Sequence, residues 1–139
     1  MGQIFSLSEA AGIGLHSMVL IAMSEKGLTA QAIAERTSSS RHHIAKVLQR
    51  LTKHNLLKSW RGPNGGFMLN KDRKAITLLD VYEAVEGVLE PQECALNHDA
   101  CAFDKCLINN ASKVITTQIK EYLQSRTLDS YLHSDAKVC

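Results

Sequence analysis

The sequence lacks the long apolar runs and leader patterns that mark membrane and secreted proteins. Its longest apolar candidate, MVLIAM at residues 18–23, is far shorter than the roughly 20 residues that a membrane-spanning helix needs. The opening residues, MGQIFSLSEAAG, have neither the basic flank nor the cleavage pattern of a signal peptide. We therefore expect a cytoplasmic protein with no membrane partner. In a reducing compartment, four cysteines favour metal or redox chemistry over a disulfide scaffold.

The motifs of common enzyme classes are also missing. No glycine-rich nucleotide loop follows an expected strand, no Ser/His/Asp set has a recognisable context, and no paired carboxylates are placed as in a cleft. We therefore predict that the protein is not an enzyme. Its 139 residues, 45% hydrophobic and 22% charged, are typical of a globular protein that can bury a real core.

Positive charge is concentrated in one part of the chain. Residues 29–74 hold ten Lys/Arg and two acids, which gives +8, whereas the rest of the chain holds six Lys/Arg and twelve acids, which gives −6. The net charge of +2 hides this asymmetry. A basic segment on a nearly neutral chain favours a surface that binds a polyanion over a face that is merely solvated.

The order of elements in the first half predicts a winged helix-turn-helix. Apolar spacing predicts a helix over residues 8–25, and Thr29 then caps a short helix. The turn TSSS precedes a well-patterned amphipathic helix that begins after Ser40. Two short strands, LLKSW and FML, flank the glycine-rich turn RGPNGG and form the expected hairpin.

The second half is predicted to be helical around a loop. Thr77 starts a helix that Gly87 ends, and a long helix is expected from about Leu107 to Leu128, followed by the polar, frayed tail DSYLHSDAKVC. The predicted fold is thus mainly α with a small β-hairpin. Its expected parts are a DNA-binding domain over 1–75, a cysteine loop with a dimerisation helix over 76–130, and a flexible tail over 131–139.

The amphipathic helix and the hairpin turn contain the residue types that bind DNA. A helix that enters the major groove needs one apolar face on the core and one basic face on the DNA. Arg61 lies at the expected hairpin tip, where glycines let the backbone approach DNA closely. A lone surface cation is more often solvated than bound, so the prediction depends on the surrounding charge of +8. The predicted DNA contacts are Ser40, Arg41, His42, His43, Lys46, Arg50, Arg61, Gly62, Asn64 and Gly65.

Four ordered segments resemble a known family. They are LSEAAGIGLHSMVLIA, SSSRHHIAKVLQRLTKHNLLKSWRGPNGGFML, ITLLDVYEAVEG and the three cysteines that follow. Together, over roughly residues 4–130, they resemble the winged-helix iron–sulfur transcription regulators that include IscR and NsrR. The resemblance implies a homodimer, joined through the long helix near 107–128, that binds a palindromic site on double-stranded DNA.

Three of the four cysteines lie within thirteen residues. Cys94, Cys101 and Cys106 are separated by six and four residues. Thiolates are soft donors that suit iron–sulfur clusters and zinc, and the absence of C-x2-C pairs weighs against a structural zinc site. The resemblance implies that these cysteines hold a 2Fe-2S or 4Fe-4S cluster whose state sets the affinity for DNA.

The resemblance also implies a fourth ligand that is not a cysteine. The positions where family members have it are occupied here by Asn109 and Gly12, neither of which suits the purpose. The remaining candidates are His98, inside the loop, Glu9, one turn before Gly12, and also Asp99, Asp104 or an exogenous small molecule.

Two other interpretations of the cysteines stay open. They would form a thiol–disulfide switch in a regulator without metal, or they would hold the cluster of a small electron carrier. The electron carrier leaves the basic segment unexplained. A steep dependence of DNA binding on salt would separate a regulator from a carrier, because only a regulator neutralises DNA phosphates.

Overall fold

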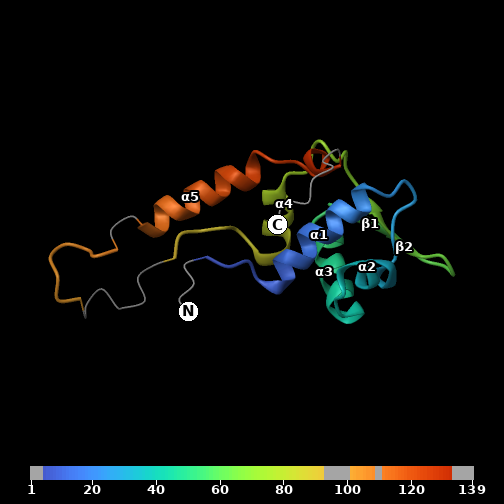
Figure 1. Cartoon of the computed structure of the whole chain (residues 1–139), viewed down its shortest axis with the longest axis horizontal. Coiled ribbons are helices and arrows are strands. Elements are labelled where there is room, and N and C mark those ends of the chain that lie inside the picture. Colours follow the sequence, from blue (N-terminus) through green and yellow to red (C-terminus); the bar gives the residue numbers. More distant parts are fainter. Residues whose placement is uncertain (1–4, 93–100, 109–110, 133–139) are drawn as a thin grey trace.

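In the computed structural model, which describes residues 5–92, 101–108 and 111–132, the regular elements are five α-helices, one β-hairpin and one 3₁₀ turn. They are α1 (Glu9–Ala22), α2 (Ala30–Thr37), α3 (Arg41–Lys53), β1 (Leu57–Trp60), β2 (Gly66–Leu69), α4 (Leu78–Glu86), α5 (Ala111–Gln124) and the 3₁₀ turn η2 (Leu128–Tyr131). Figure 1 shows the three N-terminal helices and α4 gathered beside the hairpin. The predicted fold, a mainly helical winged helix-turn-helix, is confirmed.

Local hydrogen bonds explain where the helices begin. The Thr29 hydroxyl accepts a bond of 3.1 Å from the Ala32 amide and caps α2. At α4, Thr77 and Asp80 form a reciprocal capping box, in which each side chain accepts a bond from the other's backbone amide. Gly87 ends α4 with a positive φ of 91°. The caps at Thr29 and Thr77 and the stop at Gly87 are therefore as predicted.

One hydrophobic core joins the helices. α1 packs against α3 and α4, and α2 packs against α3. The side chains of Met18, Ile44 and Val81 are completely buried in this core. Ile76 lies there too, so the core includes residues on both sides of the boundary predicted after residue 75. None of the described helices has the length and apolarity needed to span a membrane.

The C-terminal part differs from the prediction of one helix to Leu128 and a frayed tail. α5 ends at Gln124, and the chain then turns back to the segment that precedes α4. The Leu128 amide donates to the Ile76 carbonyl at 3.0 Å, and the Leu128 side chain is completely buried. Burying a leucine contributes about 1.5–3 kcal/mol, which is enough to fix this return. Tyr131 also packs on the core, while residues 133–139 lie outside the described part.

The hairpin and residues 101–108, which include Cys101 and Cys106, lie at opposite ends of the described part of the molecule (Figure 1). Figure 1 shows α5 leading away from the helical core, with residues 101–108 beyond its N-terminal end and the hairpin on the far side. α5 packs on α4, and Leu123, near its C-terminal end, is its buried residue. A conformational change in the cysteine segment can therefore affect the hairpin of the same chain only through the helical core.

Candidate nucleic-acid interface and cysteine segment

The second helix of the helix-turn-helix, α3, is fixed by its apolar face. Ile44, Val47, Leu48 and Leu51 are buried, as their spacing predicts. The turn before α3 bends at Ser38, which adopts a left-handed conformation with φ 52°. Ser40 is the N-cap residue, yet its side chain makes no capping hydrogen bond. The hydroxyl and the first amides of α3 are thus available to a phosphate.

The opposite face of α3 is exposed and basic. Arg41, His42, His43 and Lys46 are all exposed there. Ala45, on the same helix, is half-buried. The exposed side chains meet the requirement for a helix that reads the major groove, although their contacts with DNA remain predictions.

The hairpin, which we call the wing, presents its turn to solvent. β1 and β2 pair in antiparallel register, with Trp60 opposite Gly66. Arg61, Gly62 and Asn64 are exposed, and Gly65 is half-buried. A Cβ atom at Gly65 would lie 2.8 Å from the Trp60 carbonyl oxygen, so the tight turn requires glycine there. The predicted wing contacts with DNA are therefore accessible.

Trp60 stabilises the wing, a role that the sequence analysis did not predict. Its indole N–H donates to the Asn64 carbonyl at 2.7 Å, across the turn. Its ring lies against Gly27 and Gly66, where added Cβ atoms would stand 2.8 and 3.0 Å from it. The signal available in the sequence was a single tryptophan next to a glycine-rich turn.

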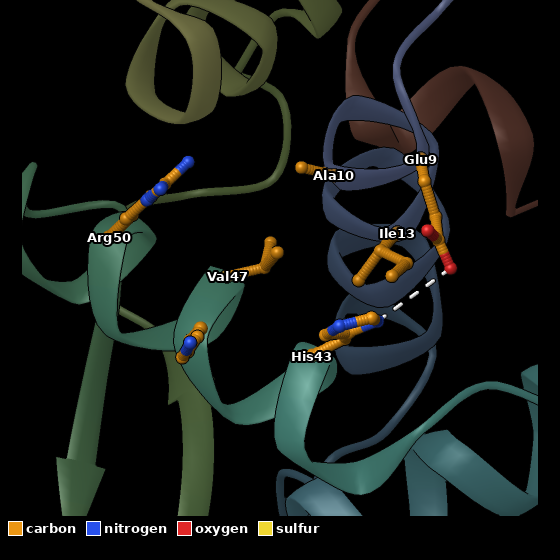
Figure 2. Close-up of a pocket in the computed structure, with 7 residues that line it drawn as sticks. Glu9, Ala10, Ile13, His43, Val47 and Arg50 are labelled. Atoms are coloured by element: carbon orange, nitrogen blue, oxygen red, sulfur yellow. Dashed lines mark ion pairs between the residues drawn. The ribbon is translucent and has the colours of Figure 1, made fainter.

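A groove of about 200 Å³ runs between the start of α1 and the side of α3 (Figure 2). Its lining combines the acid Glu9 with three bases of α3, His43, Lys46 and Arg50. The Nδ1 atom of His43 lies 3.7 Å from the Glu9 carboxylate, and both side chains are more than half exposed. Such an exposed pair contributes little to stability, so little free energy is lost if His43 leaves Glu9 to contact another group.

Arg50, also predicted to contact DNA, is exposed, and its guanidinium donates to the Val85 carbonyl at 3.1 Å, in the last turn of α4. Figure 2 shows Arg50 at the opposite end of the groove from His43. The same turn of α4 accepts a hydrogen bond from the Ser8 hydroxyl at the Glu86 carboxylate. Burial raises the pKa of the nearby Tyr82 phenol, and the charge of Glu86 raises it further.

The described part of the cysteine segment is open to solvent. Cys101 and Cys106 are exposed and unpaired with each other. Cys94 and His98 lie outside the described residues. Among the residues that are described, no three His, Cys, Asp or Glu side chains stand close enough to hold a metal ion. Glu9 therefore does not stand with Cys101 and Cys106 in one chain.

The helix α5 presents apolar side chains to solvent. Val114 and Tyr122 are each 52% exposed, and Ile115 is half-buried. Ile108, which lies within the long helix predicted from the sequence, precedes α5 and is also exposed. Exposed apolar side chains of this kind are typical of a protein–protein interface.

Comparison with known proteins gives a consistent result. The model of the Rrf2 family, described as "Iron-dependent Transcriptional regulator", matches residues 7–134. The transcriptional regulator IscR of Pectobacterium atrosepticum is 25% identical over 130 residues, which are 94% of this chain and 76% of that protein. IscR of Sodalis glossinidius is 31% identical over 96 residues, which are 69% of this chain but only 58% of that protein.

Solved structures of regulators share the fold. CymR of B. subtilis, called the global cysteine regulator, superposes with a TM-score of 0.78 at 26% identity, covering 95% of this chain and 100% of that one. IscR of T. potens superposes with a TM-score of 0.72 at 23% identity, covering 97% and 95%.

Proposed function

Because this chain belongs to the Rrf2 family of iron-dependent transcriptional regulators, we propose that an iron–sulfur cluster held by its cysteine segment controls its binding to DNA. The chain is a winged-helix transcription regulator, and its relatives are named as regulators rather than enzymes. The observation that supports the mode of DNA binding best is the shared exposure of the basic face of α3 and the wing tip. Arg41, His42 and Lys46 on α3, with Arg61 on the wing, are the proposed main contacts.

The donor set fits an iron–sulfur cluster. Cys101 and Cys106 are free, exposed thiols, and thiolates are the usual ligands of such clusters. Cys94, Cys101 and Cys106 would hold the cluster, with a fourth ligand from His98 or Glu9. When bound, the cluster supplies a redox-active iron centre that reacts with oxidants. The cysteine segment would be ordered by ligation, and it joins α4 on one side to α5 on the other.

The exposed apolar side chains of α5 support the proposal of a homodimer. Covering Val114, Ile115 and Tyr122 with a second copy would remove them from water, and two wings would then face two half-sites of a palindromic operator. A homodimer with equivalent DNA-binding surfaces requires a DNA site with matching symmetry.

A regulator without metal is the second candidate. The same exposure of Cys101 and Cys106, with no third donor beside them among the described residues, also suits a thiol–disulfide switch. The electron carrier is disfavoured, because the relatives are named as transcription regulators.

Iron and sulfide analysis separates the two candidates. Protein purified without oxygen should contain iron and acid-labile sulfide in near-equal amounts, with visible charge-transfer absorption. Cys101→Ser should lose all three signals, whereas Cys139→Ser, a cysteine outside the segment, should keep them. If the wild-type protein contains neither iron nor sulfide and still binds DNA, the cluster is excluded and the thiol–disulfide switch remains as the candidate function.

The DNA contacts are tested by salt dependence. Replacing Arg61 by alanine should weaken binding and lower the slope of log affinity against log salt by about 0.9 per lost phosphate contact. Lys113→Ala, which removes an exposed cation from α5, is the matched control and should leave the slope unchanged. Equal slopes for wild type and Arg61→Ala would remove the wing from the interface.

A further inference from the structure

The last turn of α4 is a junction between three other segments. The Arg50 guanidinium of α3 donates to the Val85 carbonyl, and the Ser8 hydroxyl at the start of α1 donates to the Glu86 carboxylate. The Leu89 amide, on the way to the cysteines, donates to the Glu83 carboxylate at 3.2 Å. The recognition helix α3, the first helix and the root of the cysteine segment therefore meet at one turn.

Electrostatics explain why Arg50 belongs there. The C-terminal end of a helix has a partial negative charge and is stabilised by cations. α4 has no basic residue in its last turn, and it has Glu83 and Glu86 there instead. Arg50 supplies from α3 the positive charge that α4 lacks, through a charge-assisted hydrogen bond.

We infer that Arg50 is a positioning residue that couples the last turn of α4 to the recognition helix, and that it does not contact DNA. α4 ends at Glu86, and residues 87–92 lead directly towards the cysteines. Movement of residues 87–92 would displace the Val85 carbonyl. Because Arg50 donates a hydrogen bond to this carbonyl, α3 would move with it. The inference rests on the proposed function, because it explains how the cysteine segment reaches the DNA-binding surface.

The test compares Arg50 with a cation on the same helix. Arg50→Met removes the donors but keeps an unbranched stem, and Lys46→Met does the same one turn earlier, at an exposed residue that lines the same groove. Each change is made in the full chain, with and without Cys101→Ser. The readouts are affinity and salt slope on a duplex that the wild-type protein selects from a random library.

Coupling and contact predict different results. In the protein that keeps Arg50, the affinities for DNA measured with Cys101 and with Cys101→Ser should differ by about 5- to 150-fold, as is usual for coupled sites. We call this factor the ratio. In Arg50→Met the ratio should fall towards one while the salt slope stays unchanged. In Lys46→Met the ratio should persist while the slope falls by about 0.9 per lost contact.

Arg50→Lys keeps a cation near the Val85 carbonyl and should retain part of the ratio, which also covers the case that Arg50→Met does not fold. A wild-type ratio that persists in the Arg50 variants, or a salt slope that falls in them, would overturn the inference. A ratio of one in the wild-type protein would refute the cysteine control of the proposed function instead. In that case, hydrogen exchange of the backbone amides of residues 83–87 tests the positioning role of Arg50. Faster exchange in Arg50→Met than in the wild type supports this role, and unchanged exchange overturns it.

Discussion

At the scale of single residues, Gly27 allows the wing to form hydrogen bonds with the segment that precedes α2. It has a positive φ of 76°, and the next residue, Leu28, exchanges two backbone hydrogen bonds with Phe67 of β2. A Cβ atom at Gly27 would stand 2.5 Å from the Phe67 carbonyl and 2.8 Å from the Trp60 ring. The attachment of the wing to the core thus depends on a glycine at residue 27.

Two glycine-to-alanine changes should have opposite effects on stability. Gly27→Ala should lower the free energy of unfolding by about 1–3 kcal/mol, because both the backbone and the contacts become strained. Gly12→Ala, in the interior of α1 with open space around it, should raise it by about 0.5–1 kcal/mol. Urea denaturation of the two variants measures both values. Stabilisation by Gly27→Ala would contradict the described wing attachment.

At the scale of elements, two N-cap residues have different roles: Thr77 stabilises its helix, whereas Ser40 is available to bind DNA. The Thr77 hydroxyl caps α4 with a bond of 3.1 Å from the Asp80 amide, whereas Ser40 at the start of α3 makes no capping bond. Thr77→Ala should cost about 1 kcal/mol of stability and leave the salt slope of DNA binding unchanged. Ser40→Ala should cost less than about 0.5 kcal/mol yet weaken DNA binding, because a phosphate would lose a partner. A large loss of stability in Ser40→Ala, with intact DNA affinity, would reverse these roles.

The elements also show what the sequence could and could not predict. Thr29, Thr77 and Gly87 were correct because caps and stops depend on a few neighbouring residues. The end of α5 was wrong because Leu128 is buried by contact with Ile76, far away in the chain. The apolar face of α3 followed from its periodicity, but the direction of Arg50 depends on the last turn of α4. No local pattern contains that information.

At the scale of the whole molecule, α5 is the surface on which a second copy should pack. Val114→Asp should convert a dimer to a monomer in gel filtration with light scattering, because a buried unpaired charge opposes association. Lys113→Asp, at an adjacent exposed and already polar residue, is the control and should remain dimeric. A Val114→Asp protein that stays dimeric would place the interface elsewhere.

The arrangement of the whole molecule separates the cysteine segment from the wing (Figure 1). Control of DNA binding must therefore pass through α4 and its junction with α3, or through a partner subunit. The most direct test measures the affinity of anaerobically purified protein for one duplex, at one salt concentration, before and after removal of its iron. The account predicts a change of at least about fivefold. Equal affinities of the iron-loaded and iron-free protein would contradict it.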